Sequence, residues 1–156
     1  HEFSQTIPAA ERDDLLQAYL TRLKDPDPGV HLPAARAWAI YEARCSTLRP
    51  NPDAVASMSD AQGMLALARI EAHYLSQGAF LAPDQLFEGI ERIRHLPATI
   101  VQGRYDMVCP IETAERLARA WPEAEFTIVP DAGHSALEPG TRAALLRAVE
   151  GLKELT

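Results

Sequence analysis

The chain has 156 residues, 47% of them hydrophobic and 24% charged, a globular composition without the signature of intrinsic disorder. Its formal net charge of −7 argues against nucleic acid or an anionic membrane as the main partner, and no apolar run approaches the roughly 20 residues that span a bilayer. Cys45 and Cys109 are isolated thiols without zinc-ligand spacing, so we expect a reducing compartment and no metal site.

The first part of the chain, up to about residue 95, has the pattern of helices alone. Apolar residues recur at helical spacing in successive stretches, and turns rich in proline and glycine separate them. Asp84 follows Pro83 and is expected to cap the last of these helices. The predicted helices cover residues 9–23, 32–48, 61–76 and 84–95.

From Pro97 onward the pattern changes to alternating strands and helices. The β-branched run at 98–101 and the run at 125–129 are typical of buried parallel strands, and helices are expected at 112–121 and 141–152. This alternation is the signature of an α/β layer. Two parallel strands alone make a poor sheet, and the sequence contains no further strands to extend it.

An acid and a histidine follow the two predicted strands. Asp106 lies in the loop after the first strand and His134, 28 residues later, in the loop after the second. Function in open α/β sheets gathers at the carboxyl ends of strands. A histidine that takes a proton from a serine needs its other ring nitrogen held by a carboxylate, and the order Asp then His fits α/β hydrolases. The alternative is that Asp106 only caps the next helix and His134 is a turn residue.

Two glutamates occupy apolar stripes of the predicted helices. Glu42 shares its stripe with Ala35, Trp38 and Cys45, and Glu71 shares its stripe with Met64, Leu67 and Tyr74. A buried carboxylate is costly without a cationic partner or several donors. Two explanations stay open: internal salt bridges, or two carboxylates that converge on a substrate ammonium. The candidate salt-bridge partners are Arg36, Arg44 and Arg69.

Four segments together resemble the proline iminopeptidases of the α/β-hydrolase superfamily. GRYDMVCP at 103–110 and DAGHSA at 131–136 look like that family's acid and histidine loops, although many hydrolases share the latter. The W-x-x-Y-E segment at 38–42 and RIEAHY at 69–74 are more specific. The resemblance covers nearly the whole chain from about Ile7.

This resemblance implies a serine exopeptidase that releases N-terminal proline from peptides, without metal or organic cofactor. His134 would be the general base, Asp106 would orient it, and Glu42 and Glu71 would bind the free imino group of the substrate. Cys109, Tyr74 and Trp38 are expected near the site, the two aromatic residues as wall or core. Cys109 is expected to be a small buried apolar residue, at a position where modification by a bulky thiol reagent would obstruct the site. A cytoplasmic location also follows from the resemblance and the few cysteines.

The chain has no G-x-S-x-G nucleophile elbow and no glycine-rich oxyanion segment. We therefore expect the C-terminal part of an α/β hydrolase, with its last two parallel strands and flanking helices at 84–156 and an all-helical cap, or lid, at 1–83. The missing N-terminal half would supply the serine, and this chain alone would be inactive. Alternatives are another lidded hydrolase of esterase or epoxide hydrolase type, and a non-catalytic fragment or partner-binding remnant.

Overall fold

The structure is a computed structural model, and it describes residues 2–53 and 60–153. The chain forms two compact units: His1–Arg44 with Asn51–Ala82, and Cys45–Pro50 with Pro83–Thr156. The assignment of residues 1–83 as the lid and 84–156 as the hydrolase core stays a prediction. No helix within the described part of the chain is both long and apolar enough to cross a membrane.

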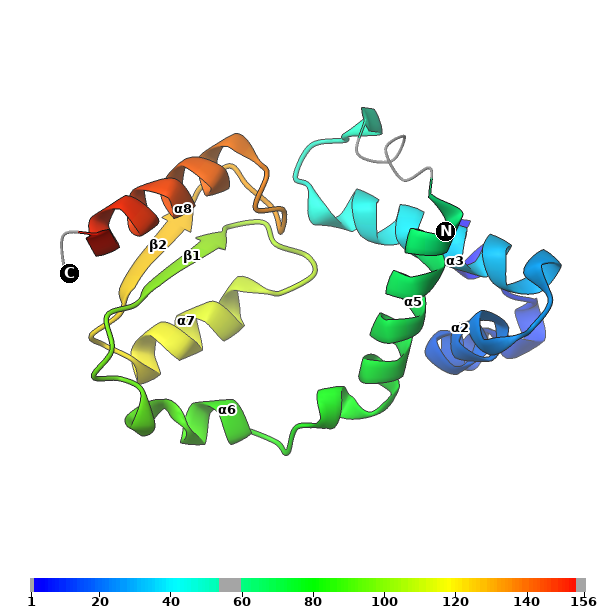
Figure 1. Ribbon diagram of the computed structural model, residues 1–156, viewed down its shortest axis with the longest axis horizontal. Coiled ribbons are helices and arrows are strands. Elements are labelled where there is room, and N and C mark those ends of the chain that lie inside the picture. Colours follow the sequence, from blue (N-terminus) through cyan, green and yellow to red (C-terminus); the bar gives the residue numbers. More distant parts are fainter. Residues whose placement is uncertain (1, 54–59, 154–156) are drawn as a thin grey trace. The chain divides into compact units, whose positions relative to one another are not determined.

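The first unit is helical, as the apolar spacing predicted (Figure 1). The stretch expected as one helix at 9–23 is divided, because the Asp14 carboxylate accepts a hydrogen bond from the Gln17 amide at 2.9 Å and starts a new helix there. The Asp60 carboxylate likewise accepts hydrogen bonds from backbone amides at the start of the helix Ala61–Ser76. The elements are α1 (Glu2–Gln5), η1 (Ala9–Asp14), α2 (Leu15–Lys24), α3 (Pro28–Ser46), α5 (Ala61–Ser76) and η2 (Gly78–Phe80).

An aromatic cluster forms part of the core of the first unit. The Phe3 ring stacks on Tyr19 with centroids 4.2 Å apart, and Trp38 meets both rings edge-on. Tyr19 is fully buried, and its hydroxyl donates a hydrogen bond to the Phe3 carbonyl at 2.7 Å. These contacts hold α1, α2 and α3 together around the indole of Trp38.

The expected apolar stripe of α5 was wrong by one position. The buried residues of this helix are Leu65, Ala68 and Ala72, whereas Leu67 and Tyr74 are 44% and 50% exposed. Helical spacing fits both stripes equally well. The small alanines allow the close approach that places α5 against α2.

The second unit contains the two expected parallel strands, β1 (Thr99–Gly103) and β2 (Glu125–Val129), paired in register from Thr99↔Glu125 to Gly103↔Val129. Helices α7 (Ile111–Ala120) and α8 (Pro139–Leu152) flank the strands in Figure 1. Val101, Val129, Ala132 and Ala144 form the core between the strands and α8.

The helix expected over 84–95 is broken, and the expected Asp84 cap is wrong. The structure has α6 (Gln85–Glu88), then Gly89, then η3 (Ile90–Arg92). Asp84 has a left-handed backbone (φ 59°) and its side chain makes no capping bond. Its carboxylate instead pairs with Arg116 of α7 at 2.5 Å, so a tertiary ion pair replaces the local cap.

Candidate active site

Asp106 and His134 meet beyond the carboxyl ends of the paired strands. The Nδ1 atom of His134 lies 3.0 Å from the Oδ2 atom of Asp106. The side chain of Asp106 is 6% exposed and that of His134 is 39% exposed. A shielded carboxylate thus holds one nitrogen of a ring that reaches solvent.

The loop after β1 fixes the Asp106 carboxylate with several donors. The Val108 and Cys109 amides donate to Oδ1 at 2.9 and 2.7 Å, and the Gln102 amide nitrogen donates to Oδ2 at 3.1 Å. Burial alone would raise the pKa of Asp106. The hydrogen bonds from Cys109, His134 and Val108 outweigh burial, so this pKa lies below its ordinary value.

An ionised Asp106 decides which ring nitrogen of His134 carries the proton. The carboxylate accepts only, so Nδ1 of the neutral ring must donate to it. Nε2 then has a free lone pair, and it makes no hydrogen bond to any residue in the described ranges. This arrangement can take a proton from a hydroxyl placed at Nε2 and stabilise the imidazolium that forms. The alternative in which Asp106 caps α7 does not apply, since its acceptor contacts end at Cys109, before α7 begins.

Gly103 at the end of β1 allows the acid and histidine loops to approach each other closely. A Cβ atom added at Gly103 would lie 1.9 Å from the Gly133 carbonyl oxygen and 2.8 Å from that of Ala132. The Tyr105 amide donates to the Ala132 carbonyl at 3.0 Å across the same contact. The spacing between Asp106 and His134 therefore depends on the absence of a side chain at Gly103.

Two residues around this site were missed by sequence reasoning, Gln102 and Glu138. Gln102 bonds to Asp106 and also to the Cys109 carbonyl at 3.0 Å. Glu138 accepts from the Gly133 amide in the histidine loop at 2.5 Å. A polar side chain next to the end of a predicted strand was a usable signal for Gln102. Nothing in the local pattern marked Glu138.

In the first unit, the structure brings the side chains of Glu42 and Glu71 together. The two carboxyl groups interact by a hydrogen bond, and the indole nitrogen of Trp38 donates to Oε2 of Glu71 at 2.8 Å. The pKa of Glu42 is raised to about 7, first by burial and then by the hydrogen bond and charge of Glu71, against an opposing effect of Trp38. Such a pair shares a proton at moderately acidic pH, or binds a cation in its place.

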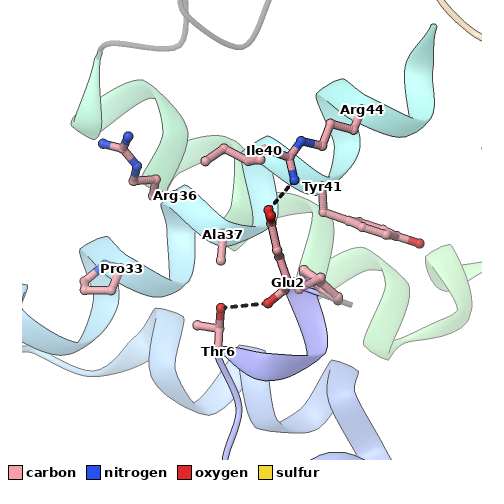
Figure 2. Close-up of a pocket in the computed structure, with 9 residues that line it drawn as sticks. Glu2, Thr6, Pro33, Arg36, Ala37, Ile40, Tyr41 and Arg44 are labelled. Atoms are coloured by element: carbon pink, nitrogen blue, oxygen red, sulfur yellow. Dashed lines mark hydrogen bonds and ion pairs between the residues drawn. The ribbon is translucent and has the colours of Figure 1, made fainter. Parts of the chain in front are cut away.

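Two of the three arginines considered as salt-bridge partners make other contacts. Arg44 pairs with Glu2, and Arg69 donates to the Leu23 carbonyl at 2.6 Å. A cavity of about 430 Å³ is lined by α3 and N-terminal residues up to Thr6. Arg36 and Arg44 lie at this cavity (Figure 2). Arg44 and Arg69 are therefore directed at these other partners and not at the carboxylate pair.

A mainly apolar cavity of about 390 Å³ borders Glu42. Its walls combine one carboxyl group with aromatic and aliphatic side chains, which suits a small ligand that has an apolar ring and a positive charge. The lining residues are Phe3, Leu15, Leu16, Trp38, Tyr41, Glu42 and Leu75.

The remaining predicted site residues are placed as follows. Trp38 is 5% exposed and lies in the core of the first unit, and Tyr74 packs edge-on against Phe80. The expectation that Cys109 is buried was wrong: it is an exposed free thiol, because the turn that binds Asp106 leaves it on the surface. Within residues 2–53 and 60–153, no three His, Cys, Asp or Glu side chains are grouped to hold a metal ion.

A parallel strand pair with an acid–histidine couple at its carboxyl edge is typical of the α/β hydrolases. Residues 15–141 match the family described as alpha/beta hydrolase fold, and the chain belongs to this family.

Named relatives agree with this assignment. The chain is 47% identical over 156 residues to a proline iminopeptidase of Arabidopsis thaliana, covering 99% of this chain and 41% of the relative. It is 44% identical over 150 residues to that of Xanthomonas citri, covering 96% and 48%. A probable proline iminopeptidase of Leptolyngbya boryana is 43% identical over 149 residues, covering 95% and 46%. The chain spans about half the length of these relatives.

Proposed function

We propose that this chain is the C-terminal portion of a proline iminopeptidase, a serine exopeptidase that releases proline from the N-terminus of peptides. The observation that carries the proposal is the Asp106–His134 couple, with Nδ1 bound to the carboxylate and Nε2 free for a substrate-side proton. The identity of more than 40% to three proteins named for this activity supports the choice among hydrolases.

In this proposal His134 is general base and then general acid, and Asp106 holds its tautomer and stabilises its positive form. The nucleophilic serine and the oxyanion donors come from an N-terminal half outside this sequence. Residues 84–156 are the end of the hydrolase core, and residues 1–83 are its helical lid. No metal or organic cofactor takes part. The two free cysteines support a cytoplasmic location, and the acidic net charge supports a peptide rather than a nucleic-acid partner.

Glu42 and Glu71 bind the protonated imino group of the substrate in this proposal. Two adjacent carboxyl groups, a Trp38 donor on Glu71 and an apolar cavity beside Glu42 support this role. A cation placed between them removes the repulsion between two ionised carboxylates. The need for that positive charge would restrict cleavage to a free N-terminus.

The test is the substitution Glu71→Gln in the complete enzyme, with Glu88→Gln at an exposed position as the matched control. A charge-assisted hydrogen bond contributes about 1.5–3 kcal/mol. The kcat/KM for a prolyl arylamide should therefore fall about 10- to 150-fold. An uncharged ester of similar size should lose less than threefold, since it makes no ionic contact. Equal losses on both substrates would remove the imino-binding role and favour a lidded esterase.

A non-catalytic remnant is the alternative to this proposal. None of the serines in the sequence lies in a G-x-S-x-G elbow. Recovery of the upstream coding sequence decides between the two. An elbow serine there, labelled by a fluorophosphonate, supports the peptidase; its absence supports the remnant.

A further inference from the structure

Glu138 occupies the N-cap position of α8, but its side chain does not cap that helix. A residue at this position normally accepts hydrogen bonds from the first amides of its own helix. The Glu138 carboxylate instead turns back toward the histidine loop and Leu48. Its Oε2 atom accepts from the Gly133 amide at 2.5 Å, and its Oε1 atom accepts from the Leu48 amide at 2.9 Å.

The same loop makes a second bond to this neighbouring segment. The Ser135 amide donates to the Ser46 carbonyl at 2.7 Å. A Cβ atom at Gly133 would lie 3.0 Å from the Leu48 nitrogen and 3.2 Å from the Ser46 oxygen, so the two backbones are in close contact. The residues immediately before and after His134 are thus both anchored, one through Glu138 and one directly.

We propose that Glu138 is a positioning residue for His134. Its carboxylate accepts hydrogen bonds from two backbone amides and so fixes the histidine loop in the position in which His134 Nδ1 contacts Asp106. Hydrogen bonds from backbone amides to a carboxylate are shorter and roughly twice as strong as neutral ones. A displacement of a reacting group by about 1 Å costs on the order of 100-fold in rate. The role in turnover rests on the function proposed above, whereas the role in holding the loop does not.

The experiment compares Glu138→Gln and Glu138→Ala with Glu150→Gln, a matched control whose exposed carboxylate pairs only with Lys153 among the described residues. The complete enzyme is used throughout. A glutamine keeps the size of the side chain but offers one acceptor oxygen and one amino group, so it satisfies one of the two amides. It also keeps the test valid should Glu138→Ala fail to fold.

Three readouts are needed. Hydrogen exchange of peptides covering 131–136 and 46–50 reports the bridge itself. The ¹⁵N spectrum of the His134 ring reports whether Nδ1 still carries the proton. Kinetics on prolyl and ester substrates separate kcat from KM.

In Glu138→Gln we expect faster exchange in both peptides, a mixture of His134 tautomers, and a 10- to 100-fold lower kcat with KM within threefold on both substrates. Unchanged exchange would show that the bridge does not hold the loop. Faster exchange with an unchanged ring spectrum and kcat would leave Glu138 a merely structural role, and either result overturns the proposal. If the wild-type enzyme cleaves no prolyl substrate, the proposed function fails, and exchange and the ring spectrum still judge Glu138.

Discussion

Substitution of Gly103 by alanine tests the close approach of the two loops most directly. The added Cβ atom would lie 1.9 Å from the Gly133 oxygen, whereas real Cβ contacts stay at or above 3.0 Å. The loops must therefore separate by about 1.1 Å. Gly103 does not have a positive φ, so the effect is steric and not one of backbone preference.

The consequence for the site can be worked out from the same distances. If the histidine loop moves as a unit, the separation of His134 Nδ1 and Asp106 Oδ2 grows from 3.0 Å to about 4 Å, beyond hydrogen-bonding range. Overpacking of this kind costs about 1–3 kcal/mol of unfolding free energy. In a protein of this size each kcal/mol lowers Tm by about 2–4 °C.

The assay is urea and thermal unfolding of the 156-residue chain, and kcat/KM of the complete enzyme. Gly151→Ala is the matched control, because a Cβ there meets nothing within 4 Å and alanine favours helix α8. We expect Gly103→Ala to be destabilised and at least 100-fold less active, and Gly151→Ala to be unchanged or slightly more stable. Normal stability and activity in Gly103→Ala would refute the steric argument.

Two further predictions concern ionisation and thiol chemistry. The folded chain keeps a proton on Glu42 between its ordinary pKa of 4.5 and about 7, while the unfolded chain loses it, so the free energy of unfolding should fall as pH rises through this window. Urea titrations at several pH values should show a smaller slope in Glu42→Gln, and an equal slope would contradict the raised pKa. Although the Cys109 residue is exposed, partial desolvation of its sulfur and then the Asp106 charge raise the pKa of this thiol. A bulky maleimide should therefore react faster above neutral pH and block prolyl cleavage. The Cys109→Ser enzyme should stay active and should not be inhibited by the maleimide, whereas the Cys45→Ser enzyme should still be inhibited.

The order of elements could be predicted from local patterns. The β-branched run before Gly103 and the apolar run before Val129 indicated strands, and the structure pairs them in parallel. The meeting of Asp106 and His134 followed from topology, because parallel strands end at one edge of a sheet. The Asp84 cap was wrong because an ion pair with Arg116, 32 residues away in sequence, competes with the local bond.

The contacts of Glu138 were not predicted because they also involve a residue far away in the sequence. One of its two amide partners, Leu48, is 90 residues away in sequence. A glutamate just before a predicted helix is common, so the local pattern did not indicate a contact with a distant segment. Contacts that depend on the return of the chain to a distant segment leave no periodic signal in either segment.

For Glu42 and Glu71, the sequence pattern predicted the position of the side chains but not their interaction partners. Spacing indicated that Glu42 and Glu71 lie on inward stripes, but it could not choose between a salt bridge and a shared site. The structure places the carboxyl groups against each other, and the indole nitrogen of Trp38 donates a hydrogen bond to Glu71. A proton or a cation between the two carboxyl groups reduces their mutual repulsion. If this pair binds the protonated imino group as proposed above, that group competes with the proton, and prolyl affinity should weaken as pH falls below about 7, the direction opposite to that of stability.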